Sequence, residues 1–226
     1  MINLKPDVIF SLNNFNVTNT VISSLFVVLV LIVFFISLRY SLRPGKIQLV
    51  LEIFYENIFR FWHEITGLRN LYIFTFCLTF LIYIGFSNII ILIPPFDAFY
   101  VESHEKHIHL FRSTFSDLNM TLALAIISVV VTNLLGIVQF GIKFFKRFLS
   151  PIGLLELISE FVKIISFSFR LFGNIFAGKV LLVVISSLVV LVIPSFFIGL
   201  EIFVGIIQAF IFFVLTSIFI KVAVHH

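Results

Sequence analysis

The fold of this chain is decided by the stretch from Ile152 to Ile193, which reads IGLLELISEFVKIISFSFRLFGNIFAGKVLLVVISSLVVLVI. Its pattern is almost continuously helical over about 42 residues, roughly twice the length that one helix needs to cross a bilayer. Pro194 interrupts the pattern, and a last apolar run follows from Gly199 to Ile220. The two runs predict two long membrane segments at the C-terminal end of the chain.

The composition of the whole chain is that of a protein whose solvent is lipid. Of its 226 residues, 61% are hydrophobic and 12% are charged, and the mean hydropathy is +1.20. A soluble domain has about 25% charged residues and could not bury so much apolar surface. Cys77 has no second cysteine to pair with, which excludes a disulfide scaffold. The basic residues lie at the ends of apolar runs rather than in one patch, which argues against a nucleic-acid partner.

Three further apolar runs have the length of a membrane span. The first is not read as a signal peptide, because it follows a polar tail and no small-residue cleavage site comes after it. The next segment has apolar residues at helical spacing with acids between them, which predicts an amphipathic helix on the membrane surface. We therefore predict an all-α integral membrane protein, a single domain over 1–226, with an outer N-terminal tail at 1–16, spans at 17–38, 71–93 and 118–142, the amphipathic helix at 47–67, and the long segments at 152–193 and 199–220.

The short loops set the orientation of these segments. Basic residues flank the first connection, within 39–69, and the third, within 143–147, whereas the second carries Lys106 and Arg112 among acids. The positive-inside rule then places the N-terminus outside and the C-terminus inside, which needs an odd number of crossings. Five membrane segments satisfy this condition.

The long segment carries its polar and charged side chains on one face. At about 100° per residue they fall within an arc of about 120°, while the other faces are apolar. An ionisable group at the centre of a membrane helix costs about 2.5–3.5 kcal/mol, so a chain retains it only where it faces protein, water or a partner. The stripe consists of Glu156, Ser159, Glu160, Lys163, Ser166, Arg170 and Asn174.

Arg170 is the charge that lies deepest in this segment. It is more than ten residues from the basic end and more than twenty from Pro194, so its side chain cannot reach either surface. No acid of its own helix lies within one turn, which favours a mobile or external anionic partner. The other charges leave two interpretations open. Either Glu160 pairs with Lys163 while Glu156 is solvated, or these groups serve a functional site.

The last segment has a compatible polar stripe. Glu201 and Gln208 are seven residues apart and share a face, with Gly205, Ala209 and Thr216 beside them. Close helix packing explains the small residues, because they let two backbones approach each other. For Glu201, solvation at the outer interface and a role in a proton relay both remain open on spacing alone.

Three histidines lie in the loop before the third span, at His104, His107 and His109. Their spacing fits no standard pair of metal ligands on a helix, so we expect a solvated outer loop and no metal site. We also expect no cofactor. The sequence contains no nucleotide-binding loop and no catalytic dyad, which argues against a stand-alone enzyme.

The stretch SFSFRLFGNIFAGKVLL, Ser166 to Leu182, resembles the signature of subunit a of F-type ATP synthases. Within this stretch, the motif RLFGN is highly specific for the family when it lies in a long charged helix and the motif QAF follows downstream. The similarity covers nearly the whole chain. It includes TNT at 18–20, RPGKIQLVLEIFYENI at 43–58, FTFCLTFLIYIGFSNIIILIP at 74–94, SDLNMTLALA at 116–125 and IIQAFIFFVLTSIFI at 206–220.

The resemblance implies that the last two segments form a tilted hairpin against a ring of c subunits, each with a carboxylate in the membrane. Protons would reach the ring through one half-channel, ride with it and leave through a second half-channel. Arg170 would separate the two paths. A guanidinium suits that position because it stays charged, favours the ionised form of a nearby carboxylate and cannot itself relay a proton.

The resemblance also implies the residues of the two half-channels. The matching positions are Asn174, Glu201 and Gln208 for the outer half-channel, Asp117 and Asn119 for its mouth, and Glu156, Ser159 and Ser166 for the inner exit. The chain departs from the family at Lys179, close to the place where a Glu or His is usual. We predict that antiparallel packing across Pro194 brings Lys179 to Glu201 and that the two form an ion pair.

As partners, the resemblance implies the c-subunit ring, b-type peripheral stalk subunits, the other subunits of the F-type ATP synthase, protons and the lipid bilayer. The extended acidic outer loop favours the plasma membrane of a bacterium, with the mitochondrial inner membrane as the alternative. Two other functions remain open, a secondary transporter or channel in which Arg170 binds an anionic substrate and a structural subunit of a respiratory complex. The chain has no internal repeat, which argues against a transporter.

Overall fold

The computed structural model describes residues 8–12, 15–40, 45–92, 100–103, 106–109, 112–141, 153–188 and 192–225. Most of these residues are helical. All the long helices except α2 are long and apolar enough to cross a membrane, which makes five candidate spans within the described ranges. The predicted all-α membrane fold is therefore confirmed. The helices are α1 (Asn19–Tyr40), α2 (Lys46–Thr66), α3 (Leu71–Leu92), α4 (Leu118–Phe140), α6 (Gly153–Leu188) and α7 (Val192–His225).

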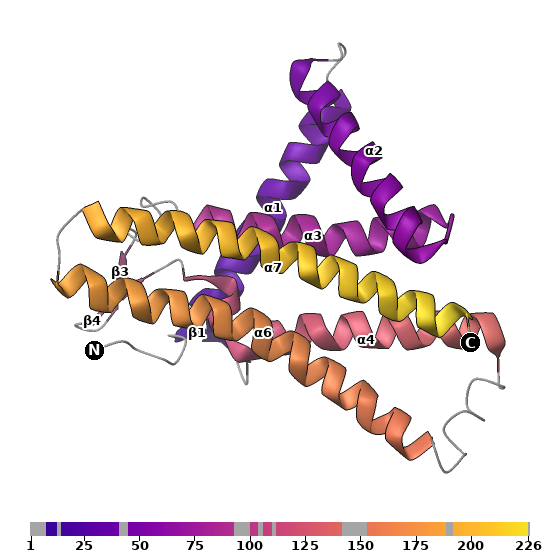
Figure 1. The fold of residues 1–226 in the computed structure, drawn as a ribbon. Coiled ribbons are helices and arrows are strands. Elements are labelled where there is room, and N and C mark those ends of the chain that lie inside the picture. The colour runs from indigo at the N-terminus through magenta and orange to yellow at the C-terminus, as the bar shows by residue number, and fades with distance from the viewer. Residues whose placement is uncertain are drawn as a thin grey trace.

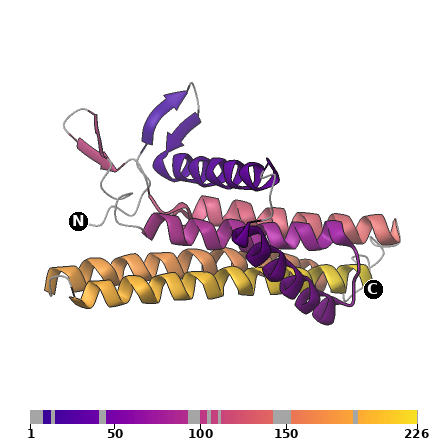
Figure 2. The same cartoon turned by 90° about the horizontal axis from the view of Figure 1, so that it is seen from above.

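The spanning helices pack in layers. Figure 2 shows α6 and α7 in one layer, α3 and α4 in a second, and α1 on the far side of that second layer. Across the two layers, α3 packs on α7, and α4 packs on both α6 and α7. Figure 1 shows α6 and α7 running antiparallel, close together near their connection and further apart toward their other ends. Within the part of the chain that the structure describes, one face of α6 and α7 thus has no covering helix.

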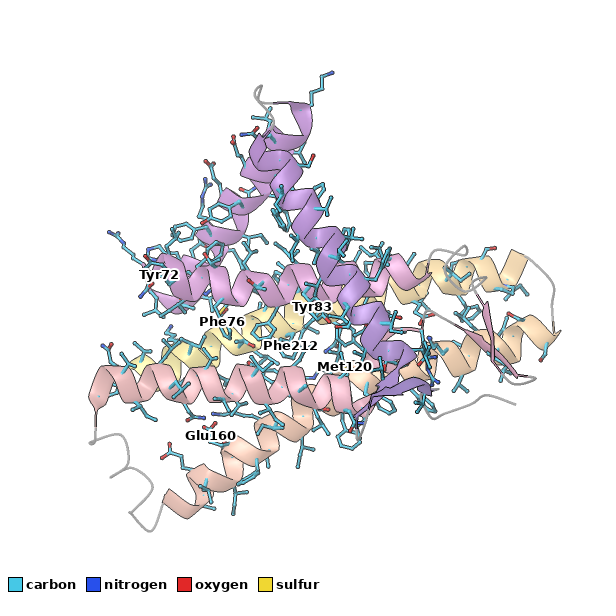
Figure 3. All side chains as sticks on the ribbon, turned by 180° about the vertical axis from the view of Figure 1, so that it is seen from behind. Tyr72, Phe76, Tyr83, Met120, Glu160 and Phe212 are labelled. Carbon is cyan, nitrogen blue, oxygen red and sulfur yellow. The ribbon has the colours of Figure 1, made fainter. Side chains whose placement is uncertain are left out.

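Aromatic side chains fill the contact between the two layers. The ring centroids of Phe167 and Phe212 are 4.5 Å apart, and those of Phe80 and Phe212 are 5.1 Å apart. Phe76, labelled with Phe212 in Figure 3, lies beside Phe80. Because lipid tails are as apolar as these side chains, the helices are held together by such van der Waals packing rather than by a hydrophobic driving force.

The amphipathic helix α2 is fastened at its C-terminal end. Trp62 is buried and packs on Phe74 of α3, with ring centroids 5.4 Å apart. Gly67 follows the helix with φ 70°, a left-handed conformation that glycine adopts without strain, and its N–H donates to the carbonyl of His63. Lys221 of α7 donates from Nζ to the carbonyl of Ile65 at 2.8 Å. The end of α7 therefore holds α2 in place.

Two short antiparallel hairpins were not predicted. They are formed by β1 (Val8–Leu12) with β2 (Phe15–Thr18) and by β3 (Tyr100–Ser103) with β4 (Lys106–His109). The sequence predicted a tail and a loop at these residues. Strands of four or five residues show too few alternations for a period of two to be recognised.

The connection between the last two helices differs from the predicted one. We expected a break at Pro194 and a last helix from Gly199, but α7 already begins at Val192 and includes Pro194 in its first turn. Proline is tolerated there because the N–H groups of the first turn have no partner within the helix. The described part of α6 ends at Leu188.

Candidate functional site

Arg170 lies on the face of α6 that points away from the rest of the chain. Its side chain is exposed, like those of Ser166 and Phe169, whereas Phe167 and Leu171 are buried against the bundle. The guanidinium donates from Nη2 to Ser166 Oγ at 3.4 Å. Across the residues that the structure describes, no carboxylate forms an ion pair with Arg170. The positive charge is therefore available to a partner outside this chain.

The next charges along α6 are compensated within the chain. Lys163 Nζ lies 2.5 Å from Glu160 Oε1, and the same ammonium lies 4.7 Å from the centroid of the Phe219 ring of α7. Asn133 of α4 donates from Nδ2 to Glu160 Oε2 at 3.0 Å. The pairing of Glu160 with Lys163, one of the two interpretations left open by the sequence, is confirmed. These groups join α6 to α4 and α7.

The three residues expected at the inner exit lie along one side of α6. Glu156 is half-buried in the first turn, where a negative charge is favoured by the helix dipole. Ser159 is exposed, and Ser166, two turns further on, is exposed and accepts the hydrogen bond from Arg170. At about 100° per residue, the three side chains fall within about 80° of one another.

Glu201 is buried where α7 meets α6. Only 8% of the residue is exposed, and its carboxyl group lies against the backbone of Gly178. A Cβ atom at residue 178 would be 2.8 Å from Glu201 Cδ, so the carboxyl group occupies the space that glycine leaves open. The ammonium group of Lys179 interacts electrostatically with this carboxyl. Lys179 is thus near enough to Glu201 to interact with it across the hairpin, while the ion pair between them stays a prediction.

Two contacts fix the register between α6 and α7. Gly178 lies beside Glu201, and Phe167, eleven residues earlier, lies beside Phe212, eleven residues later in α7. Because the helices are antiparallel and both contacts are eleven residues apart on each helix, each residue of α6 between them has a fixed partner position on α7. It sets Asn174 opposite Gly205, one turn from Glu201, and sets Leu171 opposite Gln208.

The polar residues of α6 and α7 follow one another from the connection of the two helices toward Arg170. Gln208 is buried, with 6% of the residue exposed, and it lies level with Leu171, the neighbour of Arg170. Asn174 is half-buried, and its Nδ2 atom is buried without a hydrogen-bond partner in the described ranges. The polar side chains of α6 and α7 thus form a column beside the Arg170 level.

Asn88 of α3 joins this column and was missed by the sequence analysis. It is 2% exposed and donates from Nδ2 to the carbonyl of Gly205 at 3.1 Å. A Cβ atom at residue 205 would be 3.0 Å from Asn88 Cβ, so the absence of a side chain at Gly205 allows this contact. The sequence did contain a sign of this contact, because Asn88 is a polar amide within an otherwise apolar span.

Asp117 lies at the start of α4. Its Oδ1 atom accepts from the backbone N–H of Asn119 at 3.0 Å, which makes Asp117 the N-cap of the helix. Its Oδ2 atom accepts from Thr20 Oγ1 of α1 at 3.1 Å. Asn119 is exposed. The carboxylate therefore has a structural task at the helix end that the sequence analysis did not assign.

Hydroxyl pairs connect α4 to the layer below it. Thr121 and Ser168 of α6 are hydrogen-bonded through their hydroxyl groups at 3.0 Å, and so are Ser128 and Thr216 of α7. All four residues are buried. Thr216, noted in the sequence for its place on the polar face of α7, thus forms a contact between helices.

The expected histidine loop lies partly outside the described residues. His104 falls there, while His107 and His109 belong to strand β4, in which His107 is paired with Glu102 and His109 with Tyr100. The part of the chain that the structure describes contains no group of three or more residues able to hold a metal ion.

Comparison with known proteins gives one consistent family. The family described as ATP synthase A chain matches residues 20–221. The chain is 34% identical to ATP synthase subunit a of Desulfosudis oleivorans over 109 residues, which cover 48% of this chain and 41% of that protein. It is 29% identical to ATP synthase subunit a of Oleidesulfovibrio alaskensis over 195 residues, which cover 83% of this chain and 77% of that protein.

Proposed function

Because this chain belongs to the ATP synthase A chain family, we propose that it is subunit a, the stator proton channel of a rotary F-type ATP synthase. The subunit carries out no chemistry on ATP. It provides two half-channels and the arginine that couples proton movement to rotation of the c ring and so to ATP synthesis. The driving force is the membrane potential, worth about 2.3 kcal/mol per charge for each 100 mV.

One observation carries this proposal, the exposure of Arg170 on a membrane helix. A charge at such a depth is retained only with a compensating partner. Its one polar contact in the described residues is the neutral hydroxyl of Ser166, so the counter-charge comes from another polypeptide. A carboxylate of the c ring that passes this face of α6 supplies it transiently. The guanidinium stays charged throughout and blocks direct proton transfer between the half-channels.

The outer half-channel runs along the column of polar residues between α6 and α7. Glu201, Asn174 and Gln208 follow one another toward the level of Arg170 and are buried or half-buried. Glu201 Oε2 and Asn174 Nδ2 are buried and have no hydrogen-bond partner among the residues that the structure covers, and water binds such atoms inside a protein. Asp117 and Asn119, with their side chains at the start of α4, form the mouth of this path.

Lys179 replaces the acid or histidine that usually stands near this place in the family. Its electrostatic interaction with Glu201 supports an ion pair that takes over the role of the usual relay pair. Uptake of protons then depends on Asp117, Gln208 and bound water as well as on Glu201.

The inner half-channel follows Glu156, Ser159 and Ser166 along α6. All three lie on one side of the helix, and Ser166 is in contact with Arg170. Protons released from the c ring on this side of Arg170 leave past these residues. The pair of Glu160 and Lys163 stays outside the path, because its charges compensate each other.

The partners of the chain are the c ring, the b-type peripheral stalk and the other subunits of the enzyme. The chain is a multi-pass membrane protein, and its relatives are bacterial, which supports the plasma membrane of a bacterium as its location.

The substitution Arg170→Ala tests the proposed function. In inverted membrane vesicles that contain the whole enzyme, we expect ATP-driven proton pumping to fall to the level of uncoupled vesicles while the amount of assembled complex is unchanged. Arg60→Ala removes a positive charge from the exposed face of α2 and is the matched control, with pumping retained. Normal pumping by Arg170→Ala contradicts the proposal. Loss of uptake of an anionic substrate would indicate a transporter instead, and loss of assembly a structural subunit.

A further inference from the structure

The pair of Glu160 and Lys163 is built into the bundle rather than formed on its surface. The side chains of Lys163 and Glu160 are 20% and 18% exposed, and Lys163 Nζ lies 2.5 Å from Glu160 Oε1. Asn133 of α4 donates from Nδ2 to the carbonyl of Val129 in its own helix and to Glu160 Oε2, both at 3.0 Å. The amide group, which has two hydrogens to donate, is thereby fixed in orientation. Glu160 is thus held at both of its oxygen atoms.

The ammonium group of Lys163 is held by the last helix as well. It lies 4.7 Å from the centroid of the Phe219 ring of α7, and the face of an aromatic ring attracts a cation. The Phe219 ring in turn packs on Phe167 of α6, with ring centroids 5.5 Å apart. We therefore expect the ammonium group to stay in this place, with its charge, when the carboxylate of Glu160 is removed.

The pair lies among the residues proposed for the inner exit. Ser159 directly precedes Glu160, and Ser166 follows Lys163 by three residues, about 4.5 Å along the helix axis. At about 100° per residue, Lys163 falls within about 60° of Glu156, Ser159 and Ser166. A proton that leaves by this exit therefore passes an ammonium group. At such a range the charge repels the proton unless a carboxylate compensates it.

We infer that Glu160, oriented by Asn133, keeps the inner exit open to protons by cancelling the charge of Lys163 beside it. This inference rests on the proposed function. Glu160 takes up no proton in this role and acts only through Lys163, so it is a positioning residue. The two partners are therefore not equivalent. Loss of the carboxylate leaves a positive charge that opposes protons, whereas loss of the ammonium group leaves a negative charge that does not.

The test measures passive proton conductance through membrane vesicles from which the ATP-hydrolysing part of the enzyme has been stripped, expressed per assembled complex. We expect Glu160→Gln, which keeps the shape and removes the charge, to lower this conductance about tenfold, the order expected for one uncompensated charge beside the path. Glu52→Gln is the matched control, because its carboxylate bonds to Gln48 on the exposed face of α2. Normal conductance by Glu160→Gln overturns the inference.

Substitution of Lys163 separates charge compensation from the joining of helices, and it decides the outcome if Glu160→Gln does not assemble. We expect Lys163→Met to conduct at least as well as the native complex. A contact that only joins helices is broken by either substitution, so a loss of conductance in Lys163→Met overturns the inference.

The double variant gives the sharpest comparison. Addition of Lys163→Met to Glu160→Gln removes the charge that was left uncompensated, so we expect conductance to recover several-fold over Glu160→Gln alone. A double variant that conducts no better than Glu160→Gln overturns the inference. Such results leave the proposed function standing, while normal pumping by Arg170→Ala removes the function itself.

Discussion

Two cations of the same helix show how surroundings decide the role of a residue. Lys163 is neutralised by Glu160 and lies over the ring of Phe219, so it holds helices together. Arg170, two turns further along α6, is exposed and meets only the hydroxyl of Ser166 within the described chain. A charge without a counter-charge in lipid is retained for function rather than for stability.

The contact of Gly178 with Glu201 leads to a prediction at the residue scale. In Gly178→Ala the new Cβ atom would lie 2.8 Å from Glu201 Cδ, so the carboxyl group must move. Because the group that moves is the far end of a side chain, we expect normal assembly. Proton pumping falls about tenfold or more, since a misplaced group interrupts the path.

Gly199→Ala is the control for this substitution, because a Cβ atom there meets nothing within 4 Å. Both variants are assayed by ATP-driven quenching of a pH-sensitive dye in vesicles. Pumping at the normal rate by Gly178→Ala would show that the position of the Glu201 carboxyl is unimportant.

The sequence identified some residues of the site and not others for a physical reason. Arg170 and Glu201 are charges in apolar runs, and such charges are visible without a structure because burying them is costly. Asn88 and Gly178 acquire their place only through contacts between helices, to Gly205 and Glu201. Those contacts depend on the register of the hairpin, which periodicity alone does not determine.

At the scale of elements, the start of α4 combines a helix cap with a link to α1. Asp117 accepts from the N–H of Asn119 and from the hydroxyl of Thr20, so one carboxylate satisfies a helix end and a neighbouring helix. The cap explains why the helix begins at Leu118, the residue at which the span was predicted to begin. An acid in this place stabilises the start of the helix, in addition to the place in the outer path that we propose for it.

Substitution of Asp117 separates these two contributions. We expect Asp117→Ala to destabilise the protein by about 1 kcal/mol, the usual loss for an N-cap, and to lower the melting temperature of the detergent-solubilised complex. Asp117→Asn keeps an effective cap, so the melting temperature is retained. Asn119→Ala is the control, because only its backbone N–H takes part in the cap. Equal melting temperatures for Asp117→Ala and Asp117→Asn would contradict the assigned cap.

The long helices could be predicted from the sequence, whereas the short strands could not. Runs of twenty or more apolar residues mark the spans directly, and α1, α3 and α4 begin and end within about two residues of the expected positions. The two hairpins are too short for their alternation to be recognised. Pro194 was read as a helix break, but a proline in a first turn and a proline that ends a helix look alike in sequence.

At the scale of the whole molecule, the layered packing of the described helices leaves one face of α6 and α7 open. The layer of α3 and α4 covers the opposite face and supplies Asn88 to the column, Asn133 to Glu160 and hydroxyl groups to both helices. Several polar groups therefore find partners on the covered side, and Arg170 is left on the open side. Figure 2 shows that α6 and α7 form an outer layer of the bundle. Under the proposed function, Arg170 on the open side of this layer would face a c subunit.

The most direct measurement is an electron cryo-microscopy structure of the assembled enzyme, in which the distance from the Arg170 guanidinium to every nearby carboxylate is determined. We predict that the nearest carboxylate belongs to a c subunit and that Ser166 remains beside the arginine. If the nearest carboxylate belongs to this same chain, or if Arg170 faces only lipid, the coupling role assigned to it is wrong.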